Sequence, residues 1–270
     1  MYTFCNSITI LNYLKKEKYQ KLPHDLFDRY LWLYTEIEEL THKLAYGKTI
    51  KPFNTYCYKK GTNILGVVYL CWENNLAELY IDSINLEELD TLLKNIFARK
   101  FAKLHITVGS KAIADYIQEQ FEIDYNNGTV KYYATSPVEI KDERVKEMCE
   151  EDEYLVRKLS KNVWGSYKSF LSNGYRFFGL VDDDNLLSMC GVSQLTAFKS
   201  EIIGVETFEE INRIQGFSKA TCSLALNETL KLNDVVTWST NSRNISSCKT
   251  AESLGFKQYY TIYDFNYNNK

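Results

Sequence analysis

Residues 213–218 combine a basic side chain, a glycine and a small hydroxyl in the order Arg213-Ile214-Gln215-Gly216-Phe217-Ser218. An extended pattern at 201–207 precedes them, and a helical pattern at 217–230 follows. The first N–H groups of a helix have no acceptor within it, and the helix dipole favours negative charge there. Glycine lets the backbone approach a ligand closely. The segment is therefore predicted to bind a phosphate or diphosphate group.

A second polar segment lies downstream, where Asn244 and Ser247 open a predicted helix at 245–254 that ends in Gly255 and Phe256. An asparagine at this position caps the free N–H groups of a helix, and its amide can equally bind a ligand. Both interpretations of Asn244 stay open. The order of the two segments, each at the start of a helix, favours one shared site.

Acid–base chemistry in the second half falls to carboxylates, because His24, His42 and His105 all lie in the first half. This excludes a Ser-His-Asp relay there. A carboxylate can accept or donate a proton, directly or through water. Glu206, just before the turn, is the first candidate, and Glu201 is the second. Strand alternation predicts that the two lie on opposite faces, and the alternative is that both are solvated charges.

The seven cysteines contain no C-x-x-C pair. Their odd number and spacing predict reduced thiols without a zinc site or a disulfide framework, so no metal is expected. Cys222 and Cys248 flank the predicted site, but neither has a histidine nearby in the sequence. Nucleophilic cysteine chemistry is therefore not predicted.

The elements that would position these residues occur twice in a similar order. In the second half, helical segments at 145–159 and 167–171 precede a hairpin (176–181 and 186–195), a strand (201–207), a helix (217–230), a strand (235–239), a helix (245–254) and a strand (256–265). In the first half, a helical stretch to about residue 46 precedes a hairpin (64–72 and 76–82), a helix with Leu86, Leu89, Leu93, Ile96 and Phe97 on one face, a strand (103–108), a helix (111–118) and extended segments (121–134).

This order predicts an α/β (α+β) chain with two related domains, 1–136 and 137–270. The boundary is placed at Ser136 and Pro137 because proline favours an extended linker. Only the second half has the glycine-bearing turn. The equivalent junction at 82–85 has neither glycine nor a basic residue, so the first copy is predicted to be degenerate.

The composition of the chain limits the kinds of partner that can be expected. The 270 residues include 45% apolar and 25% charged residues, which is typical of a globular protein. A net charge of −3 argues against broad nucleic-acid binding, which needs a basic surface. The start of the chain lacks the pattern of a signal peptide, and no apolar stretch is long enough to span a bilayer. A cytoplasmic protein with no membrane or nucleic-acid partner is expected.

The two polar segments together resemble the acyl-CoA-binding core of the GNAT N-acetyltransferase superfamily. The pattern Q/R-x-x-G-x-G/A is matched by Arg213, Gly216 and Ser218, with serine replacing the usual final glycine or alanine. The later pattern, Asn-x-x-Ala/Ser before a helix and Gly-Phe, is matched by Asn244 and Ser247. The resemblance covers the last 100 residues or so by sequence and the first half by element order alone.

One departure points to a narrower branch. Many members have a tyrosine on the second helix that protonates the leaving thiolate, and this chain has Ala251 there. That resembles the two-domain GNAT acetyltransferases akin to zwittermicin-resistance proteins, in which a Trp-Ser/Asp strand end precedes the asparagine. Trp238-Ser239-Thr240-Asn241 fits this pattern, as does Trp164-Gly165-Ser166.

The resemblance implies a tandem GNAT-like fold with mixed central sheets flanked by helices. It implies acetyl-CoA as cosubstrate and transfer of its acetyl group directly to a primary amine of a small molecule. The implied catalytic candidates are Glu206, Glu201 and, as donor to the thiolate, Tyr259. The implied cofactor-binding residues are Val205, Thr207, Arg213, Gln215, Gly216, Phe217, Ser218, Lys219, Asn244 and Ser247. The alternatives are a non-catalytic acyl-CoA-binding or interaction module, and a transferase that uses another acyl donor.

Overall fold

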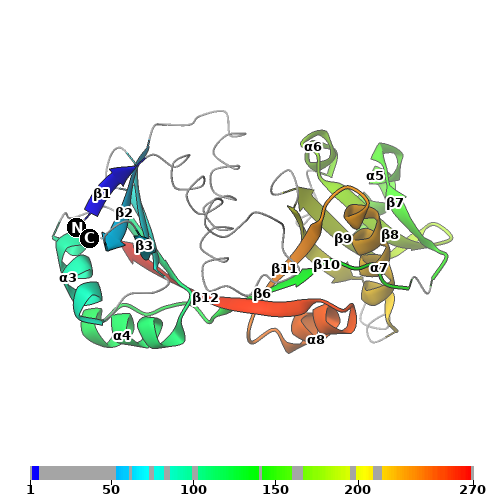
Figure 1. Cartoon of the computed structure of the whole chain (residues 1–270). Helices are drawn as coiled ribbons and strands as arrows, with labels where there is room; N and C mark the ends of the chain where they lie inside the picture. The colour runs from blue at the N-terminus through cyan, green and yellow to red at the C-terminus, as the bar shows by residue number, and fades with distance from the viewer. Residues whose placement is uncertain are drawn as a thin grey trace. The chain divides into compact units, whose positions relative to one another are not determined.

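The computed structural model describes residues 2–5, 53–60, 63–72, 76–81, 86–98, 103–139, 142–159, 167–194, 199–208 and 215–268 (Figure 1). Contacts between Cα atoms divide the chain into two compact units. Unit 1 contains Met1–Val130 and Tyr259–Lys270, and unit 2 contains Lys131–Gln258. The boundary at 136 and 137 drawn from Pro137 stays a prediction. None of the described helices is long and apolar enough to cross a membrane.

Unit 1 is a mixed sheet in the order β1-β2-β3-β4-β5-β12 with two helices on one face. Those helices bury Leu89, Leu93 and Ile117 against the side chains of Ile106 and Phe265. The elements are β1 (Tyr2–Cys5), β2 (Phe53–Lys60), β3 (Asn63–Trp72), β4 (Leu76–Ile81), α3 (Leu86–Phe97), β5 (Lys103–Val108), α4 (Lys111–Phe121) and most of β12 (Lys257–Asn268).

Unit 2 has a sheet in the order β6-β11-β10-β9-β8-β7. The helix α7 lies across one face of β7 to β10, and α5 and α6 cover the other face (Figure 1). The elements are β6 (Thr129–Ala134), β7 (Val145–Met148), the 3-10 helix η1 (Glu150–Asp152), α5 (Glu153–Leu159), α6 (Tyr167–Ser172), β8 (Arg176–Asp182), β9 (Asn185–Gln194), β10 (Lys199–Thr207), α7 (Phe217–Leu230), β11 (Val235–Asn241) and α8 (Ile245–Ser253).

The two sheets follow one plan. Each has a parallel pair, β4 with β5 and β10 with β11, joined by a helix that crosses the sheet. Beside β5 lies β12, the last strand of the chain, and beside β11 lies β6, the last strand of the first half. Each sheet is therefore completed by a strand from the other half of the sequence. This confirms the predicted mixed sheets flanked by helices.

The parallel pairs differ where a ligand would enter. The six residues of β4 and β5 are paired throughout, from Leu76 with Lys103 to Ile81 with Val108. By contrast, β10 pairs with β11 only from Lys199 to Ile202. The rest of β10 stays paired with β9 but departs from β11, after a register shift between Ile202 and Gly204 that marks a β-bulge. Among the residues that the structure describes, the open edge within a parallel pair therefore lies in the second unit.

Most predicted elements of 63–134 and 167–268 are confirmed within two or three residues. Three predictions between residues 86 and 159 were wrong. Residues 145–148 form β7 rather than helix, because Val145 and Met148 are buried against β8. Phe121 belongs to α4, which ends at Glu122 with a positive φ of 55°. Leu86 is 49% exposed, and Leu92 is buried on that helix face instead.

The N-terminal prediction is only partly covered. Residues Tyr2–Cys5 form a strand, not the predicted helix, because their backbone pairs with β2. The strand β2 itself was not predicted. The predicted helices between residues 6 and 46, and the segment Trp164-Gly165-Ser166, lie outside the described residues.

Candidate active site

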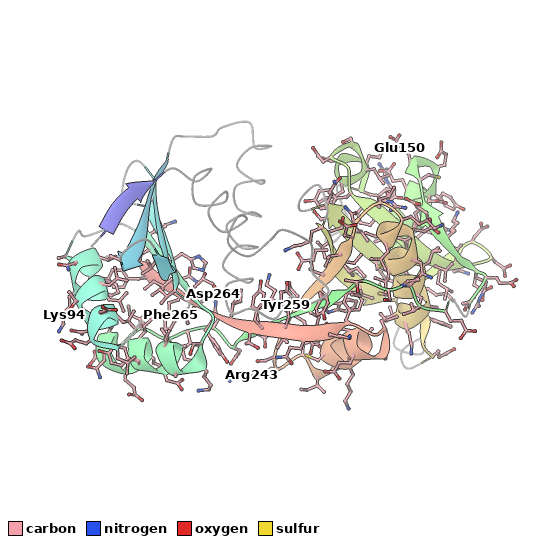
Figure 2. All side chains as sticks on the ribbon, viewed as in Figure 1. Lys94, Glu150, Arg243, Tyr259, Asp264 and Phe265 are labelled. Atoms are coloured by element: carbon pink, nitrogen blue, oxygen red, sulfur yellow. The ribbon has the colours of Figure 1, made fainter. Side chains whose placement is uncertain are left out.

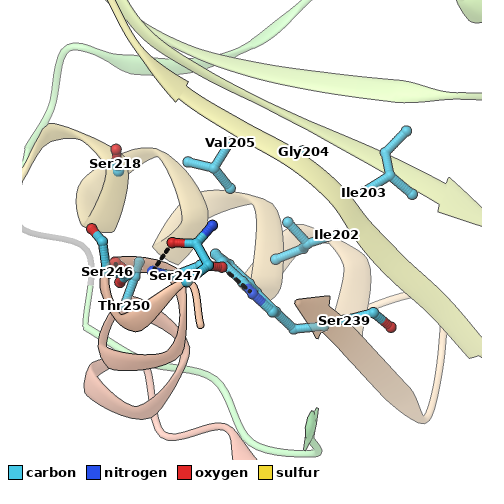
Figure 3. Close-up of a pocket in the computed structure, with 11 residues that line it drawn as sticks. Ile202, Ile203, Gly204, Val205, Ser218, Ser239, Ser246, Ser247 and Thr250 are labelled. Atoms are coloured by element: carbon cyan, nitrogen blue, oxygen red, sulfur yellow. Dashed lines mark hydrogen bonds between the residues drawn. The ribbon is translucent and has the colours of Figure 1, made fainter. Parts of the chain in front are cut away.

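A cavity of about 300 Å³ opens where β10 and β11 separate. Figure 3 shows its wall: one side is the bulged stretch of β10, and the other is formed by the first turns of α7 and α8. The lining residues are Ile202, Ile203, Gly204, Val205, Ser218, Trp238, Ser239, Asn244, Ser246, Ser247 and Thr250. We call this space the wedge cavity. Its size is at the lower end of the range for small-molecule sites.

The bulge decides which side chains of β10 share a face. Val205 pairs with Cys190, and Glu206 with Met189. Thr207 contacts Ser218 of α7, so Thr207 and Val205, two residues apart, face α7. Glu206 faces the α5 and α6 side, where Met189 is buried.

The same register places Glu201 opposite Ser193. Ser193 lies four residues from Met189 on β9, so both point to the same face, and Glu201 points to that face as well. Glu201 and Glu206 thus lie on one face of β10. The prediction of opposite faces was wrong, because the extra residue of the bulge reverses the alternation. Consecutive Ile202 and Ile203 before Gly204, in the middle of a strand, were the available signal for a bulge.

The turn before α7 has the predicted shape. Gly216 is the N-cap of α7 with a positive φ of 83°, a conformation that favours glycine. A Cβ placed on Gly216 would meet no atom within 4 Å, so the space before this backbone is open. The intrahelical bonds begin with Ala220 N–H donating to Gly216 O at 2.9 Å, which leaves the earlier N–H groups of α7 without an acceptor in the helix.

A second cavity of about 190 Å³ borders the same turn and is lined by Glu139, Asp142, Gln215, Gly216, Phe217, Lys219, Ala220 and Ser223. The carboxylate of Asp142 accepts two hydrogen bonds from the guanidinium of Arg144, at 2.9 and 2.7 Å. These bonds lower the pKa of Asp142 despite its partial burial. Of the two acids in this lining, Asp142 is thus paired with a cation, and Lys219 brings a positive charge beside Glu139 and Asp142.

The start of α8 contributes hydroxyl groups. Asn244 Oδ1 accepts a hydrogen bond from Ser247 N at 3.2 Å, so Asn244 is the N-cap of α8. The indole Nε1 of Trp238, which can only donate, donates to Ser247 Oγ at 3.0 Å. Both bonds are drawn in Figure 3. The amide nitrogen of Asn244 and the proton of Ser247 remain able to donate to a ligand.

Two close hydroxyl contacts connect the walls of the wedge cavity. Thr207 Oγ1 contacts Ser218 Oγ, which joins the end of β10 to the first turn of α7. Ser239 Oγ donates to Glu201 Oε1, which joins β11 to β10 next to the last paired residues. Ser239 lines the wedge cavity and Glu201 lies behind it. Ser239 as a site residue was not predicted, because its partner is 38 positions away in the sequence.

Three other predicted site residues are not found among the residues that line the two cavities. Glu206 does not line either described cavity, and its backbone O accepts a hydrogen bond from Ser188 Oγ at 2.9 Å. Tyr259, labelled in Figure 2, belongs to unit 1. Its ring packs edge-on against that of Tyr260, with ring centroids 4.3 Å apart. Arg213 lies outside the described residues. The roles assigned to these residues stay predictions.

Two further positions singled out in the sequence are buried. Cys222 is fully buried, and burial raises the pKa of its thiol, with a further contribution from Cys190. A buried thiol with a raised pKa is a poor nucleophile. Ala251, which stands where the resemblance would imply a tyrosine, belongs to α8 and is fully buried. The described part of the chain holds no cluster of His, Cys, Asp and Glu suited to a metal ion.

Solved structures with the same fold cover the whole chain. A tandem GNAT protein from the clavulanic acid biosynthesis pathway has 9% identity and a TM-score of 0.58, covering 100% of this chain and 98% of that one. A GCN5-related N-acetyltransferase from Sphaerobacter thermophilus has 13% identity and a TM-score of 0.60, with coverage of 100% and 96%. A GNAT-family acetyltransferase from Colwellia psychrerythraea has 13% identity and a TM-score of 0.54, with coverage of 99% and 100%. At such identities they show the fold alone.

No protein with a curated description matches the sequence significantly. The sequence profile of GNAT acetyltransferases, in contrast, matches residues 75–263, which is more than half of the chain and includes every described site residue. The matched residues include β10, the turn at Gly216 and the start of α8. The chain therefore belongs to the GNAT acetyltransferase family.

Proposed function

We propose that this protein is an N-acetyltransferase that moves the acetyl group of acetyl-CoA directly to a primary amine of a small molecule. The observation that carries the proposal is the wedge cavity between β10 and β11, with the open turn of Gly216 at the start of the next helix. In unit 1 the described residues of β4 and β5 are paired throughout, and residues 82–85, which follow β4, lie outside the described part of the chain. We therefore place the acyl donor in unit 2.

The residues of unit 2 fit an acyl-CoA. The open backbone at Gly216 has room for a diphosphate, and the helix dipole of α7 favours its charge. The amide of Asn244 and the hydroxyls of Ser246 and Ser247 line a slot suited to the polar, uncharged pantetheine arm. In the contact between Ser218 and Thr207, one hydroxyl donates its proton to the other oxygen. The proton of the accepting hydroxyl is then available to a phosphate oxygen.

Bound acetyl-CoA would supply a thioester that is reactive toward amines. The backbone of β10 after Ile202 has no partner strand on the β11 side. Because the N–H groups of successive residues point to opposite edges of a strand, one of the two at Gly204 and Val205 points to this side. That N–H group is suited to stabilise the oxyanion that forms on the thioester carbonyl. Holding both reactants in one cavity contributes several kcal/mol, by order of magnitude, without a covalent enzyme intermediate.

The test is calorimetric titration with acetyl-CoA, followed by free-thiol release with a panel of small primary amines. Gly216→Asp places negative charge at the diphosphate position and is expected to weaken acetyl-CoA binding at least a hundredfold, because like charges repel in a confined site. Gly174→Asp is a matched control, since Gly174 also has a φ of 83° and nothing within 4 Å of an added Cβ. Both variants carry the same backbone strain, and only Gly216→Asp should lose binding.

Absence of acetyl-CoA binding at millimolar ligand would overturn the proposal. Binding without thiol release over the whole panel would favour the alternative of a non-catalytic acyl-CoA-binding module, which the apolar Ala251 motivates. Copurification of tRNA with steep salt dependence would favour another acyl donor.

A further inference from the structure

We infer that Ser239 and Glu201 form a proton-relay dyad at the apex of the wedge cavity, in which Ser239 contacts the attacking amine and Glu201 is the base. This inference rests on the proposed function and adds the path of the proton. Its starting point is the Ser239 Oγ–H to Glu201 Oε1 hydrogen bond between β11 and β10.

The position of the dyad follows from the register of the parallel pair. Ile202 with Trp238 is the last pair before β10 and β11 separate, so Ser239 is the first residue of β11 beyond the split. Trp238 points toward α8, where it bonds Ser247, so Ser239 points to the opposite face by alternation. In Figure 3, Ser239 lies at the edge of the cavity away from Ser246 and Ser247.

Glu201 is on that same face, because it pairs with Thr237, two residues before Ser239. Its carboxylate is partly buried behind the Ser239 hydroxyl and does not itself line the wedge cavity. A proton that leaves the cavity toward Glu201 would therefore pass through Ser239. Glu206, the other carboxylate of β10, lies five residues farther along the strand, away from the apex.

The chemistry balances without a further reactant. The lone pair of the neutral amine attacks the thioester carbonyl carbon, the C–N bond forms, and the C–S bond breaks with its electron pair leaving on sulfur. The amine proton passes to Ser239 Oγ while the Ser239 proton passes to Glu201 Oε1. Glu201 then returns its proton to solvent, and solvent protonates the thiolate. Ser239 touches the substrate, whereas Glu201 acts through it.

Three variants separate this relay from a merely structural bond between the strands. Glu201→Gln keeps an acceptor oxygen for Ser239 but removes the base. It should lower kcat/KM for amine acetylation about a hundredfold or more, the usual contribution of a general base. Ser239→Ala should lower kcat/KM at least tenfold, and Ser239→Thr, which keeps the hydroxyl on a strand, should restore most of it. The double variant should be no slower than Glu201→Gln alone, because the two residues act as one unit.

The pH profile gives a readout that a structural role would not move. In Glu201→Gln the acidic limb of kcat/KM should follow the protonation of the amine substrate alone, because the carboxylate base is gone while the attacking amine must still be neutral. Acetyl-CoA affinity and the thermal midpoint should stay within about twofold and a few degrees of wild type. Ser172→Ala, which removes an exposed hydroxyl from α6, is the matched control.

The outcomes are distinct. If wild type neither binds acetyl-CoA nor acetylates any amine of the panel, the proposed function fails and the dyad with it. If wild type is active and Ser239→Ala or Glu201→Gln keeps its rate and its pH profile, the proposed function stands and the dyad is wrong. If Ser239→Thr is as slow as Ser239→Ala, the hydroxyl has no role and the relay is likewise overturned.

Discussion

Asp152 is a single buried carboxylate that connects β7 to the helix that follows. It is 5% exposed, and it accepts hydrogen bonds from Lys146 Nζ at 2.7 Å and from Cys149 N at 3.0 Å. Burial by itself would raise the pKa of Asp152, but the bonds from Lys146 and Cys149 outweigh it and hold the pKa below its usual range. The ionised form is therefore the one that stabilises the fold.

Asp152→Asn should lower the free energy of unfolding of unit 2 by about 2 kcal/mol at neutral pH, since it removes charge-assisted bonds to a buried group. Because the pKa is lowered on folding, the stabilisation is present above the ordinary pKa of an aspartate and is lost as pH falls through the folded value. The difference between wild type and variant should shrink as urea titrations move from pH 7 to pH 3. Asp183→Asn, in an exposed turn, is the control, and a pH-independent difference would contradict the assignment.

The role proposed for Glu201 also belongs to the residue scale. Its residue type and its position on a strand made Glu201 a candidate from the sequence. The face of the sheet to which it points and its hydrogen-bond partner depend on the neighbouring strands. The bulge after Ile202 put it on the same face as Glu206, and the register of β11 put Ser239 in front of it. Neither fact is present in the local pattern 201–207, since both depend on strands that are distant in the sequence.

At the scale of elements, α8 begins with a residue that can serve both the helix and a ligand. Asn244 accepts from Ser247 N, and its side chain lines the wedge cavity. Capping needs only an oxygen acceptor, which aspartate also provides. Donation to a ligand needs the amide N–H groups, which aspartate lacks.

Asn244→Ala should therefore cost about 1 kcal/mol of stability through loss of the cap and should also weaken acetyl-CoA binding. Asn244→Asp should keep the stability but weaken acetyl-CoA binding about tenfold, as expected for one lost hydrogen bond near a charged ligand. Thermal unfolding and calorimetric titration of the two variants give both quantities. If Asn244→Asp binds acetyl-CoA like wild type, Asn244 is a cap and nothing more.

Element order and type were predictable over most of the described chain, because periodicity and turn residues are local. The hairpin at Arg176–Asp182 and Asn185–Gln194 and the helix Phe217–Leu230 show this. The exception at Val145–Met148 is instructive. A four-residue segment with two buried ends fits a helix or a strand equally well, and the free edge of β8 decided in favour of the strand.

At the scale of the molecule, the last strand of the chain belongs to the first unit. Phe265 of β12 is 0% exposed and packs in the core formed by α3, α4 and β5 (Figure 2). Residues 263–268 pair with β5 in antiparallel register. The stability of unit 1 therefore depends on residues near the C-terminus.

Phe265→Ala should lower the free energy of unfolding of unit 1 by about 3–5 kcal/mol, as for other buried phenylalanines. Hydrogen exchange followed by mass spectrometry should show faster exchange in α3 and β5, while α7 keeps its protection. Phe208→Ala, in the core of unit 2, should give the reverse pattern. If hydrogen exchange in Phe265→Ala became faster only in α7 and β9, the assignment of β12 to unit 1 would be contradicted.

The sequence by itself determined the order of the elements, the glycine turn at Gly216, the helix start at Asn244 and the family that these features resemble. These depend on neighbouring residues, whose φ/ψ preferences and hydrogen-bonding groups are set locally. Only the tertiary structure decided which strand completes each sheet, where β10 leaves β11, and which hydroxyl stands before Glu201. Those features arise because a strand must satisfy its hydrogen bonds with a distant partner, and the identity and register of that partner depend on how the whole chain packs.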